Sequence, residues 1–266
     1  MNNVLVFLII SFLFCLPVKG TGQTSPAVNN IDSANTAVVP VPKLENDSYN
    51  WYDRHAEALR VKDSINPEII LLGNSIAHFW GGLPQLRYAD GRLRNPNGPV
   101  SWAGLFGPYR VLNLGFGWDR TQNVLWRLDH GEVDGLHPRL VIVEIGTNNT
   151  SQTKNARANT PEEIVDGIAS ICSRLRAKLP ESKIVLMAVL PREKNPNHPL
   201  REQIKLINIK LAAFARQQGI LVVDISSGLL AADSTFLPGM TNDYVHPTDK
   251  GYQVWADAIR ALVVAQ

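Results

Sequence analysis

The chain has 266 residues, of which 45% are hydrophobic and 19% are charged, as expected of a globular protein with a sizeable core. Its formal net charge of +2 is too small to favour a nucleic-acid or polyanion partner. The two cysteines, Cys15 and Cys172, predict neither a disulfide framework nor a thiolate metal site, and no cofactor is expected.

The first segment is an apolar run from Val4 to Leu16, which is too short to cross a membrane comfortably. Because small residues follow, ending at Gly20, residues 1–20 are predicted to be a cleaved secretory signal peptide. The alternative is an uncleaved anchor, since no Lys or Arg precedes the run. We therefore expect a secreted or periplasmic protein without stable membrane insertion.

The next segment lacks any apolar period and is rich in Thr, Ser, Asn, Pro and Ala. Such a composition cannot bury enough surface to order itself, so residues 21–48 are predicted to be a flexible linker. The folded domain is expected over residues 49–266. It starts with a helical pattern from Trp51 to Val61 that packs on the outside of the domain.

Five short apolar runs in the domain are typical of strands buried on both faces. Helical patterns separate them, and the one after Thr160 opens with a capping box that Glu163 completes. This alternation predicts a flavodoxin-like, three-layer α/β/α sandwich around a five-stranded parallel sheet. The runs are Ile69–Leu72, Arg110–Leu114, Leu140–Ile145, Ile184–Leu190 and Ile220–Ile225.

Chemically active residues follow the first three strands, at the sheet edge where parallel folds bind ligands. Ser75 follows the first strand, where a serine is either a nucleophile or a helix N-cap. The glycines after the second strand, in Gly115–Thr121, let the backbone approach a ligand, but a phosphate-binding loop is not favoured because the third glycine and the Gly-Lys-Ser/Thr pattern are absent. Gly146–Asn149, after the third strand, delivers side-chain amides that can donate to an oxyanion.

One more polar pair precedes the last predicted helix, which Thr248 can cap. His246 lies just before this helix, and Asp243 lies three residues earlier, where it can orient the imidazole. On its own, such a pair is as typical of a metal site or a helix cap.

Taken together, these segments resemble the SGNH (GDSL-type) hydrolase family, and the resemblance extends from about residue 69 to the C-terminal helix. The segments between them are most similar to the catalytic subunits of intracellular platelet-activating-factor acetylhydrolase Ib. The family motifs are Gly73-Asn74-Ser75, Gly115–Asp119, Gly146–Asn149 and Asp243–His246, and the intervening matches are Asn123–Leu128, Leu190–Arg192 and Asn208.

The resemblance implies a serine esterase in which Ser75 is the nucleophile, His246 the general base and Asp243 the residue that orients His246. It also implies an oxyanion hole formed by the N–H of Ser75, the N–H of Trp118 and the side-chain amide of Asn148.

Three neighbouring residues, Asn74, Gly117 and Asn149, are predicted to contact the substrate. Two positions depart from the family pattern: Asn74 stands where Asp is usual, and Trp118 stands where Gly is common. Since the Trp118 side chain must fit in or beside the site, we expect a small acyl pocket.

The substrate implied is a short-chain, in particular an acetyl, ester. Trp80, Trp102 and Trp118 near the predicted mouth favour an acetylated glycan, although tryptophans in this pattern are equally typical of a core. The resemblance leaves a homodimer open.

Three other functions are considered. An O-acetyltransferase would use the same acyl-enzyme with another acceptor. A catalytically silent glycan-binding module would share the fold without the chemistry. An α/β-hydrolase is disfavoured because Ala77 stands where its Gly-x-Ser-x-Gly elbow requires glycine.

Overall fold

A computed structural model describes residues 34–265, and the described residues from 35 onward form one compact unit. The predicted signal peptide and the first part of the predicted linker lie outside the described residues and stay predictions. The unit is built on a five-stranded parallel sheet in the order β2-β1-β3-β4-β5, which confirms the predicted flavodoxin-like architecture. The strands are β1 (Ile69–Gly73), β2 (Val111–Gly115), β3 (Leu140–Glu144), β4 (Lys183–Met187) and β5 (Leu221–Val223).

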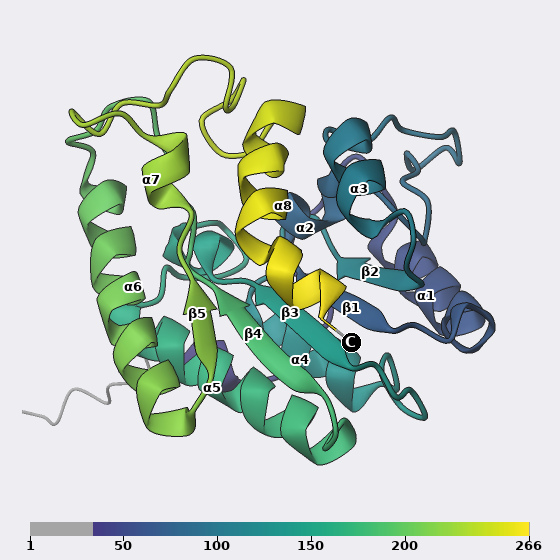
Figure 1. Cartoon of the computed structure of the whole chain (residues 1–266). Coiled ribbons are helices and arrows are strands. Elements are labelled where there is room, and N and C mark those ends of the chain that lie inside the picture. Colours follow the sequence, from purple (N-terminus) through teal and green to yellow (C-terminus); the bar gives the residue numbers. More distant parts are fainter. Residues whose placement is uncertain (1–33, 266) are drawn as a thin grey trace, which may run out of the picture. The chain divides into compact units, whose positions relative to one another are not determined.

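Helices cover both faces of this sheet, so that the strands lie in the middle of three layers (Figure 1). One face packs against α1 (Trp51–Ile65), α4 (Thr121–Asp129), α5 (Pro161–Lys178) and α6 (Pro199–Gln218). The other packs against α2 (Ser75–Trp80), α3 (Pro99–Phe106), α7 (Ser226–Leu229) and α8 (Asp249–Val264). Within residues 34–265, no helix combines the length and the apolar character that crossing a bilayer demands.

The register of the sheet brings the carboxyl ends of three strands together. Gly73 of β1 pairs with Gly115 of β2 on one side and with Glu144 of β3 on the other. The residues that follow these three positions therefore leave the sheet side by side. For this reason the predicted motifs, which lie far apart in the sequence, share one edge.

The domain starts earlier than predicted, because residues 35–48 pack on it instead of forming a flexible linker. This N-terminal strap (residues 35–48) includes a short 3₁₀ helix, Thr36–Val38, with Ala37 fully buried. The Thr121 hydroxyl donates to the Ala37 carbonyl (2.8 Å), and the Asn123 side chain donates to the Pro42 carbonyl (2.6 Å). Side chains of α4 thus satisfy the backbone of the strap, which needs no apolar period of its own.

Candidate active site

Ser75 is the first residue of α2, directly after β1. The N-cap is Asn74, whose side-chain oxygen accepts from the N–H of Ile76 (2.8 Å), so the capping role considered for Ser75 falls to its neighbour. As the first helical residue, Ser75 has an N–H without an acceptor inside the helix. Its hydroxyl is free to face another side chain.

The partner of that hydroxyl is His246, 171 positions later in the chain. The Ser75 Oγ lies 2.8 Å from His246 Nε2, and His246 Nδ1 lies 2.7 Å from Asp243 Oδ2. The other carboxylate oxygen of Asp243 accepts from the N–H groups of Val245 and His246 (3.0 and 2.8 Å). Burial raises the pKa of Asp243, but the His246 hydrogen bonds outweigh it and hold that pKa below its usual value. The carboxylate is therefore charged at neutral pH.

The loop after β2 carries the predicted backbone donor, Trp118. This residue has φ = 63°, in the left-handed region, and its side chain is 40% exposed. For a residue other than glycine, such a backbone is strained by on the order of 1–3 kcal/mol. Next to it, the Asp119 carbonyl accepts from Asn148 Nδ2 (3.0 Å), so one amide hydrogen of Asn148 is used and the other remains.

The structure gives the three predicted substrate-contact residues internal roles. Asn74 and Asn149 are both fully buried, and Asn149 donates to Thr121 Oγ1 and accepts from its N–H (3.0 Å each). Gly117 is also buried, and a Cβ there would come within 2.0 Å of Asp47 Oδ2. These contacts shape the loops around the site, and the role of the three residues in substrate binding stays a prediction.

Trp80, predicted either at the mouth or in the core, lies in the core. It is fully buried and stacks on Tyr252 of α8, with ring centroids 5.1 Å apart. Cys172 is buried in α5, where burial raises the pKa of its thiol to about 12, as fits a packing residue.

One buried carboxyl lies at the end of β3, where Glu144 pairs with Gly73 of β1, two residues before Ser75. Glu144, at the end of β3, is fully buried, and burial raises its pKa to about 8 against the opposing effect of Asn74. The carboxyl is thus largely neutral at pH 7 and places no full negative charge beside Ser75.

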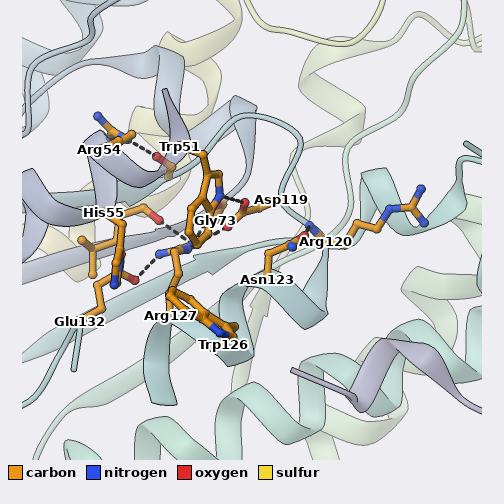
Figure 2. A network of polar contacts seen from close by, with 12 residues as sticks. Trp51, Arg54, His55, Gly73, Asp119, Arg120, Asn123, Trp126, Arg127 and Glu132 are labelled. Atoms are coloured by element: carbon orange, nitrogen blue, oxygen red, sulfur yellow. Dashed lines mark hydrogen bonds and ion pairs between the residues drawn. The ribbon is translucent and has the colours of Figure 1, made fainter. Parts of the chain in front are cut away.

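A buried ionic network, which sequence reasoning did not anticipate, supports the loop after β2 (Figure 2). The guanidinium of Arg127 pairs with Asp119 (2.8 Å) and with Glu132, and it lies over the Phe116 ring. Burial alone lowers the pKa of Arg127, but Glu132 and Asp119 raise it overall. Trp51 Nε1 donates to the same Asp119 carboxylate (2.7 Å).

Residues 71–254 match the model of the GDSL-like lipase/acylhydrolase family. The chain belongs to this family. It is accordingly a hydrolase of the esterase type that acts on acyl esters.

Relatives in this family include platelet-activating factor acetylhydrolase IB subunit alpha1 from Bos taurus, 29% identical over 226 residues that cover 85% of this chain and 87% of that protein. The alpha2 subunit from Rattus norvegicus is 28% identical over 235 residues, covering 87% and 91%.

Among solved structures, a GDSL-like lipase from Bacteroides thetaiotaomicron superposes with a TM-score of 0.60 at 21% identity, covering 79% of this chain and 98% of that one. An acetylxylan esterase from Geobacillus stearothermophilus gives a TM-score of 0.54 at 18% identity, covering 75% and 95%. At these identities the structural likeness supports the fold alone.

Proposed function

We propose that this protein is a secreted serine esterase that hydrolyses short-chain acyl esters and removes acetyl groups from carbohydrate hydroxyls. The observation that carries the proposal is the chain of contacts from Ser75 Oγ to His246 Nε2 (2.8 Å) and from His246 Nδ1 to Asp243 Oδ2 (2.7 Å). A serine hydroxyl is too weakly acidic to attack an ester unless a base takes its proton.

In the first half-reaction, Ser75 Oγ attacks the ester carbonyl carbon while its proton passes to His246 Nε2. The charged Asp243 stabilises the imidazolium that forms. The carbonyl oxygen becomes an oxyanion, which accepts hydrogen bonds from the N–H groups of Ser75 and Trp118 and from the Asn148 amide.

Collapse of this intermediate breaks the bond to the alcohol, which leaves with the proton held by His246. Water then repeats the sequence on the acyl-enzyme: His246 takes a proton from the water, and the acid leaves as Ser75 recovers its hydrogen. In each half His246 acts first as the base and then as the acid, while Ser75 is the nucleophile in the first half and the leaving group in the second.

The acetyl preference is supported by the resemblance to the acetylhydrolase subunits and by the crowded loop that carries Trp118. The carbohydrate part is supported by the exposed Trp118 ring, because aromatic rings pack on sugar faces. Export is supported by the sequence of residues 1–20. N-terminal sequencing of the exported protein tests the cleaved signal peptide, and a start at Met1 would contradict it.

The direct test is acetate release from acetylated xylooligosaccharides and from p-nitrophenyl acetate, with Ser75→Ala as the matched control. We expect release from both substrates and a loss of at least about 10³-fold in the variant. Undiminished activity of Ser75→Ala would overturn the assignment. Transfer of acetyl to an added sugar, with no free acetate, would identify an acetyltransferase instead.

Acyl-chain length tests the small pocket separately. Because Trp118 occupies the position where glycine is common, we expect kcat/KM to fall at least about 10-fold from p-nitrophenyl acetate to the octanoate. This corresponds to about 1.4 kcal/mol. Equal or better hydrolysis of the octanoate would contradict a small pocket.

A further inference from the structure

Alternate residues of the loop after β2 are held by one short segment at the start of the domain. Arg54 Nε donates to the carbonyl of Gly115 (2.8 Å), and Trp51 Nε1 donates to the carboxylate of Asp119 (2.7 Å). Between these two, the hydroxyl of Tyr49 donates to the carbonyl of Gly117 (3.1 Å). We call the three residues Tyr49, Trp51 and Arg54 the brace.

The three side chains of the brace are buried. Tyr49, Trp51 and Arg54 are 6%, 2% and 7% exposed, so each hydrogen bond is sheltered from water. All three guanidinium nitrogens of Arg54 donate to backbone carbonyls. Besides the carbonyl of Gly115, these are the carbonyls of Pro84 and Asn113. The segment lies outside residues 71–254, which match the family model.

The opposite side of the loop is held just as firmly. The N–H of Gly117 donates to Nδ1 of His78 (3.2 Å), a buried residue of α2, three positions after Ser75. The Gly117 residue is therefore fixed at both its N–H and its carbonyl. The peptide that carries the Trp118 N–H begins at that same carbonyl group, so its orientation follows from these contacts.

On the far side of Trp118, the brace reaches a second predicted oxyanion donor. Trp51 and Arg127 hold the Asp119 carboxylate (Figure 2). The Asp119 carbonyl accepts from Asn148 Nδ2. Trp118 itself has a positive φ of 63°, a backbone that relaxes unless its neighbours are fixed. The two residues on either side of it, Gly117 and Asp119, are the ones that the brace holds.

We propose that Tyr49, Trp51 and Arg54 are positioning residues for catalysis, which aim the Trp118 N–H and the Asn148 amide at the developing oxyanion. The proposal rests on the proposed function, because it requires those two donors to form the oxyanion hole. The three brace residues act through the loop that they hold and not through contact with the substrate. Their effect is on the transition state, where the oxyanion exists, and not on binding of the ester.

The test uses the full-length protein with Tyr49→Phe, Trp51→Phe and the double variant. These changes remove a donor and keep an aromatic ring. Tyr52→Phe, which changes an exposed residue of α1, is the matched control. Rates are measured with p-nitrophenyl acetate and divided by the concentration of active sites, titrated with a serine-directed phosphonate, so that unfolded protein does not count.

We expect kcat per active site to fall about 5- to 20-fold in each single variant and further in the double variant, with KM changed less than about threefold. Tyr52→Phe should keep the wild-type kcat. A brace that only stabilised the fold would lower the melting temperature and the number of titrated sites and leave kcat per site unchanged, and that result overturns the proposal.

Two controls separate this inference from the proposed function. If Ser75→Ala is inactive while the double variant keeps wild-type kcat per site, the brace proposal fails and the esterase assignment stands. If Ser75→Ala is fully active, the esterase assignment fails. Should the double variant not fold, Tyr49→Phe, which deletes a single oxygen atom, decides alone: a kcat within twofold of wild type overturns the proposal.

Discussion

Asp243 lies on an exposed loop, where a carboxylate alone would move freely in solvent. Its side chain is 54% exposed, yet one oxygen receives two backbone N–H groups and the other receives the His246 ring. The turn itself is fixed by the Thr241 hydroxyl, which accepts from the N–H of Tyr244 (2.9 Å). The carboxylate therefore keeps the imidazole in the tautomer whose Nε2 can accept from Ser75.

Asp243→Asn tests this role. The amide keeps the shape of the carboxylate but cannot hold the Nδ1–H tautomer or stabilise the imidazolium, so we expect kcat to fall about 10²- to 10⁴-fold with little change in melting temperature. Steady-state kinetics and thermal unfolding of the purified variant check it. A kcat within fivefold of wild type would show that His246 does not need this partner.

Sequence reasoning at the residue scale succeeded in placing Ser75 and His246 together, because each lies in a short motif whose position in a parallel fold is fixed by the strand before it or the helix after it. It did not foresee that Asn74 and Asn149, predicted to contact a substrate, are fully buried, because neighbours from other segments bury them. It gave no sign of the brace, because Tyr49 meets Gly117 across 68 positions and no sequence pattern links Tyr49 to the Gly115–Asp119 motif.

At the scale of elements, all five predicted strands form, since continuous β-branched and aliphatic runs fit a parallel sheet. The edge strand β5 is only partly buried, whereas the other four are buried along most or all of their length. The fourth strand ends at Met187, earlier than the predicted Leu190. The reason is a side chain: Asn208 of α6 accepts from the N–H of Val189 and donates to its carbonyl (2.8 and 2.9 Å), which takes that residue out of the ladder. A hydrogen bond from a distant helix cannot be read from the apolar pattern.

The end of β3 offers a prediction about pH. The pKa of Glu144 is about 8 in the fold, against about 4.5 for an ordinary glutamate. Between these two pH values the folded protein keeps a proton on Glu144 that the unfolded chain has lost. The stability that the protonated Glu144 contributes is therefore fully present below about pH 4.5 and is lost as the pH rises to about 8.

Glu144→Gln, which cannot ionise, should remove that loss. Between pH 4.5 and pH 8, the free energy of unfolding of the variant relative to that of wild type should rise by on the order of 3–5 kcal/mol. Urea unfolding of both proteins at these two pH values measures it. The same pH dependence in both proteins would mean that Glu144 is ionised in the folded state.

For the whole molecule, two separate cores on the faces of one sheet keep its carboxyl edge rigid, and the site is assembled on that edge. The strap of residues 35–48 adds to one of these layers through backbone contacts with α4. A linker was predicted there because the strap has no apolar period. The strap is held through its backbone carbonyl groups, which every residue has, so its composition does not reveal these contacts.

Truncation tests the strap. The reference is a chain that begins at residue 34. A chain that begins at residue 49 should lose on the order of 2–4 kcal/mol, because Ala37 and several hydrogen bonds are removed, and melt roughly 5–15 °C lower. Differential scanning calorimetry of the two chains decides, and equal melting temperatures would show that the strap contributes nothing.

The central claim is that Ser75 carries the acyl group during turnover. Mass spectrometry of protein quenched in acid within its first turnovers of p-nitrophenyl acetate tests it most directly. We predict an acetyl adduct on the peptide that contains Ser75, and no adduct on that peptide in Ser75→Ala. An acetyl group on a different residue, with Ser75 unmodified while the enzyme turns over, would contradict the account.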